Sequence, residues 1–88
     1  MTQPITLDVS LLEPPEPMER ILEATEILQP GQYLLVLHHR EPFPLYSILA
    51  REGFSHSTRA GRQTPYEIFI WRTSDVEATA SVQSALNS

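Results

Sequence analysis

Closely spaced prolines stand immediately before two helical patterns, and they constrain the fold more than any other feature of the sequence. "LEPPEP" leads into "MERILEATEIL", and "EPFP" leads into "LYSILARE". Proline has a fixed φ and no backbone donor, so it fits the first turn of a helix but not the interior of one. The sequence therefore fixes where both helices begin and makes the approach to each of them stiff.

The segments around these prolines show alternating strand and helix patterns. "ITLDVSL" alternates apolar and polar residues, "QYLLVL" is apolar on both faces, and "FSHSTRA" and "YEIFIWR" flank the hairpin-length connector "GRQTP". After Pro15, apolar residues recur three and four positions apart from Met18 to Leu28. A shorter helical pattern follows Pro44 and ends at Gly53, where a helix can be capped.

These elements predict the order β-α-β-α-β-β and an α+β two-layer sandwich with a four-stranded mixed sheet and two helices on one face. The right-handed first crossover makes the first two strands parallel. Residues 1–73 are expected to form this single domain. Residues 74–88 form a polar tail that is either disordered or a short helix, and its weak apolar face favours disorder.

The second face of the predicted sheet has no helical cover within residues 1–73. Phe69 and Trp71 point to that face, so it is expected to be a partner surface or a surface for weak self-association. The alternative is that the tail covers it. Ser74 and Glu77 form a capping pattern from which a covering helix would begin.

Composition excludes several classes of function. The chain has no cysteine, which removes disulfides, thiolate metal sites, persulfide carriage and thiol nucleophiles together. It has no long apolar run and no basic, apolar leader, so we expect a cytoplasmic protein without a membrane segment. The net charge of −5 and the lack of a continuous basic stripe argue against binding of nucleic acid.

Together, "LEPPEP", "MERILEATEIL", "PG", "HHREPFPLY" and "YEIFIWR" carry a family resemblance over residues 5–72. They resemble the TusA/SirA-like superfamily of small sulfur carriers, and more closely an uncharacterised sister family, a domain of unknown function. The resemblance implies the same β-α-β-α-β-β fold. Aligning Pro15, Glu16 and Pro17 with the carriers' Cys-Pro-x-Pro motif puts Pro14 in the place of the cysteine. Sulfur relay at this position is then chemically ruled out, and a scaffold with a docking surface remains.

The two proline-stiffened helix starts are the candidate binding surface. They follow parallel strands, so they are expected at the same end of the sheet. At the first helix start the glutamates suit a basic partner better than an anion. At the second, Arg40 can gather with Arg51, Arg59 and Arg62 into a basic rim for an anionic ligand or a partner carboxylate. The alternative is that the prolines serve only the first helical turns and that the second loop is ordinary solvated surface. The predicted binding residues are Glu13, Glu16, Met18, His39, Arg40, Glu41 and Phe43.

Histidines supply a second candidate site, for a transition metal or haem. The residues are His38, His39 and His56. Neighbouring strand residues point to opposite faces, so His38 and His39 are not expected to hold one ion together, but one of them can meet His56 across the sheet. The alternative is single histidines with ordinary hydrogen bonds, and no cofactor is expected.

No nucleophile elbow, phosphate-binding glycine loop or metalloprotease motif is present, so we expect no enzyme activity. Three hypotheses remain. The first is a non-catalytic binding or adaptor domain with a protein partner, the second is the metal or haem site, and the third is a degenerate component of a sulfur-transfer system that docks without carrying sulfur.

Overall fold

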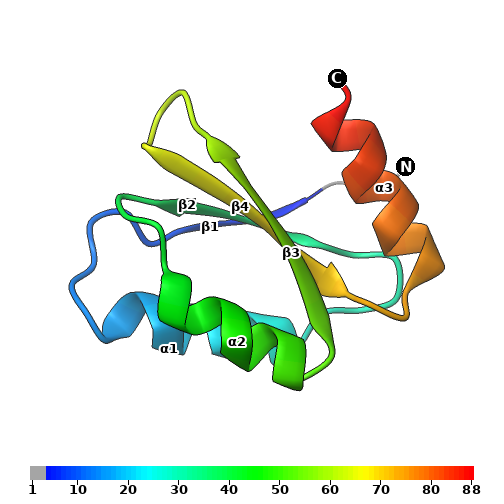
Figure 1. Cartoon of the computed structure of the whole chain (residues 1–88), viewed down its shortest axis with the longest axis horizontal. Coiled ribbons are helices and arrows are strands. Elements are labelled where there is room, and N and C mark those ends of the chain that lie inside the picture. The colour runs from blue at the N-terminus through cyan, green and yellow to red at the C-terminus, as the bar shows by residue number, and fades with distance from the viewer. Residues whose placement is uncertain (1–3) are drawn as a thin grey trace.

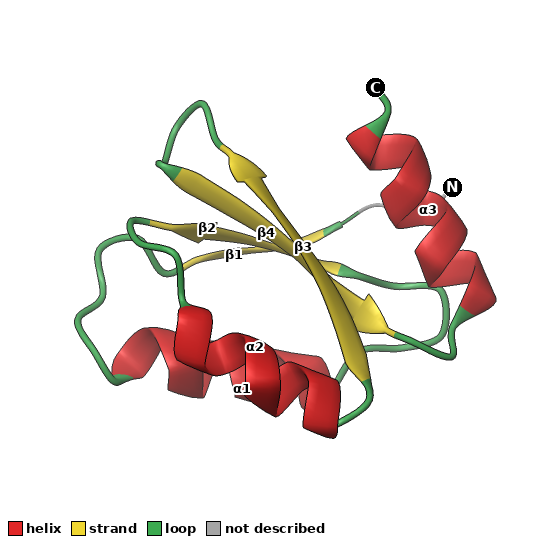
Figure 2. Cartoon of the chain, in the orientation of Figure 1, coloured by secondary structure: helices red, strands yellow, loops and turns green. Residues whose placement is uncertain are grey.

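Four strands and three helices make up the computed structural model, which describes residues 4–88 (Figures 1 and 2). In chain order they are β1 (Ile5–Asp8), α1 (Glu16–Glu26), β2 (Leu34–His38), α2 (Phe43–Arg51), β3 (Phe54–Ala60), β4 (Tyr66–Arg72) and α3 (Val76–Leu86). The predicted α+β class and the order β-α-β-α-β-β are confirmed, and α3 follows them. Within residues 4–88, no helix has the length and apolarity that a membrane crossing requires.

The strands form one mixed sheet in the order β1-β2-β4-β3. β1 runs parallel to β2, with Ile5 opposite Leu34. β4 is antiparallel to both β2 and β3, and it forms the predicted hairpin with β3. β2 and β4 are therefore the two inner strands, which explains why both are apolar on both faces.

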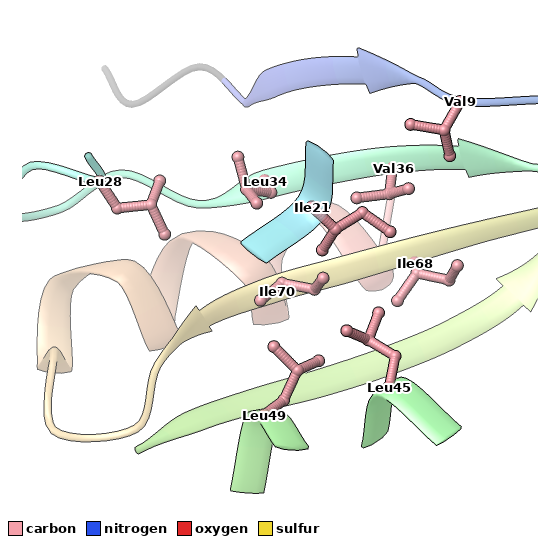
Figure 3. Close-up of a cluster of buried hydrophobic side chains, with 9 residues drawn as sticks. All are labelled: Val9, Ile21, Leu28, Leu34, Val36, Leu45, Leu49, Ile68 and Ile70. Atoms are coloured by element: carbon pink, nitrogen blue, oxygen red, sulfur yellow. The ribbon is translucent and has the colours of Figure 1, made fainter. Parts of the chain in front are cut away.

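α1 and α2 lie on one face of the sheet, here called the α1/α2 face (Figure 1). Ile68 and Ile70 of β4 point to this face and are fully buried. The core between the sheet and the two helices is shown in Figure 3 and consists of Val9, Ile21, Leu28, Leu34, Val36, Leu45, Leu49, Ile68 and Ile70. Most of these side chains come from the two helices and the two inner strands, and Val9 and Leu28 come from the segments that follow β1 and α1. Burying them fixes the position of each helix on the sheet.

α3 covers the opposite face of the sheet, here called the α3 face (Figure 1). The predicted alternation along β4 is confirmed, since Phe69 and Trp71 point to this face, but they are only 2% and 7% exposed. The Trp71 indole N–H donates to Thr79 Oγ1 at 3.1 Å. This second core consists of Tyr33, Phe69, Trp71, Ala78 and Val82. The expectation of an open face for partners or self-association was wrong, because the tail folds into a helix that buries the aromatic residues.

A long-range cap holds the start of α3. Asp75, and not Ser74, is the capping residue, and its carboxylate accepts the Ala78 N–H at 2.9 Å. The other carboxylate oxygen accepts the N–H of Gly31 at 2.8 Å. Gly31 has a φ of +84°, which favours glycine. The "PG" turn after α1 therefore also anchors α3, and this contact joins residues 44 positions apart.

Removing a buried methyl pair from α3 tests whether this helix is part of the stable core. We expect Val82→Ala to lower the free energy of unfolding by about 2 kcal/mol, because Val82 is fully buried. Val76→Ala is the matched control, since Val76 is 83% exposed, and should change it by less than about 0.5 kcal/mol. Urea unfolding followed by Trp71 fluorescence measures both. Equal effects of the two variants would show that α3 does not pack on the sheet.

Candidate functional site

Two connections between strands and helices lie together at one end of the sheet. Residues 9–15 join β1 to α1, and residues 39–42 join β2 to α2. Because β1 and β2 are parallel, their C-terminal ends reach the same end of the sheet, and Figure 1 shows both connections there. The sheet topology thus brings together two segments that each end in a proline-rich helix start.

A groove of about 400 Å³ lies between these two helix starts. One wall comes from the start of α1 and the other from the end of β2 and the start of α2. Its lining residues are Pro14, Pro15, Pro17, Met18, His38, Arg40, Glu41, Pro42 and Pro44. Five of the eight prolines of the chain are among them, so most of the wall is rigid and apolar.

Proline shapes the two helix starts in the same way. Pro15 precedes α1 and Pro17 is its second residue, while Pro42 precedes α2 and Pro44 is its second residue. Neither helix start has a side-chain hydrogen bond as a cap. The prolines take the place of polar caps, because a residue without an N–H leaves no donor to satisfy. As a result, the walls facing the groove are apolar where capped helices would present polar side chains.

His38 is the buried polar residue of the groove, with 4% of its surface exposed. It is the last residue of β2 and points to the α1/α2 face, like Val36 two positions before it. Its Nδ1 accepts the backbone N–H of Arg40 at 3.2 Å. Burial, together with the nearby His39 and Arg40, lowers the pKa of His38 below its ordinary value. His38 is therefore a neutral imidazole in a fixed orientation at neutral pH.

Arg40 and Glu41 are the charged residues of the groove, and they do not pair with each other. Glu41 Oε2 accepts the hydroxyl of Tyr46 at 3.1 Å. Among residues 4–88 the only ion pair joins Arg59 to Glu67, at 2.9 Å. The exposed guanidinium of Arg40 thus has no carboxylate partner within the described chain.

Aromatic side chains of α2 and β3 form a stacked surface beside the groove. Tyr46 stacks on His56 with ring centroids 3.9 Å apart, and Phe43 meets the edge of Tyr46 at 6.0 Å. The Tyr46 hydroxyl also contacts Thr58 Oγ1 at 2.6 Å. Phe43 itself is 67% exposed, between the two groove prolines Pro42 and Pro44. A large apolar side chain is therefore displayed next to the groove.

A separate acidic strip runs along the exposed side of α1. It carries Glu16, Glu19, Glu23 and Glu26, with Arg20 and Leu22 among them. The shallow hollow between these side chains shares no lining residue with the groove. The acidic patch predicted at the helix start is thus the beginning of a longer solvated surface, and it lies outside the groove.

The structure separates His56 from His38, two of the three histidines predicted as metal ligands. His38 pairs with Tyr66 and His56 with Ile70, so they lie four residues apart on opposite sides of β4. That spacing corresponds to ~13 Å along the strand and ~10 Å across it. No group of three or more His, Cys, Asp or Glu side chains in the described part of the chain is arranged to hold a metal ion.

His39 differs from its predicted orientation. Its ring centroid lies 5.3 Å from that of His38, so the two rings are neighbours and do not point to opposite faces. The reason is that β2 ends at His38, and strict alternation ends with it. His39 Nδ1 is buried without a hydrogen-bond partner among the described residues, and the residue does not line the groove.

The structure brings together only part of the predicted binding set. Met18, Arg40 and Glu41 line the groove. Four predicted residues lie outside the lining, namely Glu13, Glu16, His39 and Phe43. The sequence prediction missed His38 as a groove residue and the prolines as its walls. The spacing of the prolines was the signal for the walls, whereas nothing in the sequence marks the direction of His38.

A protein-family model matches most of the chain. The model of the uncharacterized conserved protein family DUF2249 matches residues 6–72. The chain belongs to the DUF2249 family. The match confirms the expected domain of unknown function over nearly the predicted span, while kinship to the TusA/SirA-like superfamily stays a prediction. Neither the curated proteins nor the solved structures compared with the chain gave a match.

The boundaries of the match divide the molecule in two. Every residue that lines the groove lies within the DUF2249 span, and so do all four strands except the first residue of β1. α3 begins at Val76 and lies beyond it. The groove is therefore built from the DUF2249 part of the chain, and α3 is an additional helix on the other side of the sheet.

The lowered pKa of His38 predicts a pH dependence of stability. The unfolded residue titrates near 6.5 and the folded one lower, so between these values the unfolded chain binds more protons. The contribution of neutral His38 to the free energy of unfolding should be fully present above pH 6.5. It should be lost as the pH falls from there through the folded pKa. The pKa of His56 is also lowered, mainly by burial, and acts with the same sign.

Denaturant unfolding between pH 5 and 7.5 measures this dependence. Asp8 and Asp75 have lowered pKa values and titrate below this window. We expect His38→Asn and His56→Gln each to have a shallower slope than the wild type. A slope unchanged in both variants would contradict the neutral, buried state of His38.

Proposed function

We propose that this domain is a non-catalytic binding module that takes an extended segment of a protein partner in the groove between the starts of α1 and α2. The observation that carries this proposal is the groove itself, with rigid apolar walls from five prolines and Met18. Rigid walls lose little conformational entropy when a ligand orders against them, so more of the contact energy is available for binding. An extended segment fits a groove better than a globular surface does.

Exposed apolar residues close to both helix starts support the same site. Leu11 is 94% exposed on the connection between β1 and α1, and Phe43 is 67% exposed at the start of α2. Large apolar side chains in solvent near a groove are typical anchors of protein interfaces. An exposed large apolar residue thus lies close to each of the two helix starts that form the groove.

The chemistry of the lining supports binding over catalysis. Among the described residues that line the groove, none carries a hydroxyl or thiol nucleophile. His38 has one nitrogen occupied by the Arg40 N–H, and Glu41 is engaged by Tyr46. These groups are arranged to hold a fixed surface, and we assign the domain no reaction.

The position of Pro14 favours a second, narrower version of this function. In the resemblance to the sulfur carriers, Pro14 stands in the place of their cysteine, and it lines the groove. A chain with no cysteine cannot carry persulfide sulfur. We propose as the narrower candidate that the domain docks to sulfur-transfer enzymes without carrying sulfur, which binding to a purified cysteine desulfurase tests.

Site-specific photo-crosslinking in the native cell tests the proposed function. With p-benzoylphenylalanine in place of Phe43, we expect a discrete protein adduct. Ile27 is the matched control position, because it is 71% exposed but lies at the C-terminal end of α1, away from the groove. An adduct pattern that is the same at both positions, or adducts at Ile27 alone, would contradict the proposal.

Alanine variants then give the size of the effect on the purified partner. Truncation of an aromatic interface anchor costs ~2 kcal/mol, so Phe43→Ala should raise the Kd about thirtyfold. Ile27→Ala should leave it within about twofold. Isothermal titration calorimetry measures both, and an unchanged Kd for Phe43→Ala would show that Phe43 is not an anchor of the interface.

A further inference from the structure

The hydrogen bond between His38 and Arg40 determines which nitrogen of the imidazole carries the proton. A backbone N–H always donates, so the Nδ1 that it reaches must be unprotonated. A neutral imidazole whose Nδ1 is unprotonated carries its hydrogen on Nε2. His38 lines the groove and its other nitrogen is occupied, so Nε2 is left as a hydrogen-bond donor for a ligand.

Arg40 contributes a second donor to the same groove. Its backbone N–H orients His38, and its guanidinium has no carboxylate partner within residues 4–88. Guanidinium and carboxylate match in a bidentate geometry, which makes an unpaired arginine a natural carboxylate receptor. One residue thus supplies both the ligand-binding group and the hydrogen bond that fixes its neighbour.

Glu41 is the one anionic residue in the lining, and its carboxylate is held by Tyr46. The Tyr46 hydroxyl donates to Oε2 at 3.1 Å, and Tyr46 itself is fixed by stacking on His56. Glu16, Glu19, Glu23 and Glu26 line the separate strip on α1. The remaining walls are proline and methionine, which offer an incoming anion no competing hydrogen-bond acceptor on their side chains.

We propose that the groove recognises a carboxylate on the extended partner segment through the Nε2–H of His38 and the guanidinium of Arg40. This inference rests on the proposed function, because it names the chemistry of the segment that the groove takes. The carboxylate belongs either to the C-terminus of the partner or to an acidic side chain flanked by apolar residues. Apolar contacts with the proline walls supply affinity, and the two donors supply selectivity for the charge.

Three short peptides that differ in their carboxylate test this proposal. They are acetyl-Leu-Pro-Leu with a free C-terminus, the same peptide as its amide, and acetyl-Leu-Pro-Glu amide. Peptides of this size are expected to bind with millimolar Kd, which NMR titration of the His38 and Arg40 side-chain nitrogens can follow. We expect the free acid, the glutamate peptide or both to bind at least tenfold more tightly than the leucine amide. Equal binding of all three, or of none, would overturn the proposal.

Variants separate the two donors from the fold. His38→Asn keeps an acceptor for the Arg40 N–H near the position of Nδ1 but removes the Nε2 donor, and Arg40→Gln removes the guanidinium. Each should weaken the carboxylate peptide about tenfold and bring it to the level of the leucine amide. Arg20→Gln, on the acidic strip of α1, is the charge-matched control and should have no effect. Equal losses for Arg20→Gln and Arg40→Gln would reduce the effect to net charge and overturn the proposal.

Two results separate a failure of the carboxylate inference from a failure of the proposed binding module. If the partner crosslinked at Phe43 binds His38→Asn and Arg40→Gln as tightly as the wild type, the carboxylate inference falls and the binding module stands. If crosslinking at Phe43 yields no adduct while the carboxylate peptides bind selectively, the groove is a carboxylate site and its assignment to a protein partner falls. His38→Gln places an amide donor near the position of Nε2. It should therefore restore part of the preference for the carboxylate peptide that His38→Asn loses.

Discussion

The parallel pairing of β1 with β2 is the constraint on which the rest of the structure depends. Ile5 lies opposite Leu34 and Leu7 opposite Val36, so the two strands run in step. Parallel strands need a crossover, which α1 supplies while it buries Ile21 in the core. The same pairing places both strand ends at one edge of the sheet, so the helix starts that follow them meet there. The groove is therefore a consequence of topology, and proline gives it stiff walls.

The two faces of the sheet are covered differently. On the α3 face, aromatic residues and Val82 form a closed core, and Asp75 locks the helix to Gly31. On the other face, α1 and α2 leave a groove at their starts that is lined by rigid side chains. The DUF2249 match ends before α3. This helix covers the aromatic residues of its face and contributes no residue to the groove lining. The helix α3 and the proposed binding groove therefore lie on opposite faces of the sheet in a chain of 88 residues.

The sequence predicted the elements well because their signals are local. Proline spacing fixes the helix starts, and the alternation of Ile68 and Ile70 with Phe69 and Trp71 assigns the faces of β4. The cover of the second face was predicted only as the alternative, because the Asp75–Gly31 hydrogen bond joins distant parts of the chain and the apolar pattern of α3 is weak. The groove lies at the end of the sheet where the two helix starts were expected to meet, but the separation of His56 from His38 depends on strand register, which no local pattern encodes.

If the groove holds one partner segment, both helix starts contact this ligand at the same time. Amide chemical-shift mapping of the labelled domain with the partner segment recovered at Phe43 tests this most directly. We expect the largest shifts to fall together in residues 14–18 and 38–44, with α3 unaffected. Shifts confined to α3, to the acidic strip of α1, or to only one of the two helix starts would contradict it.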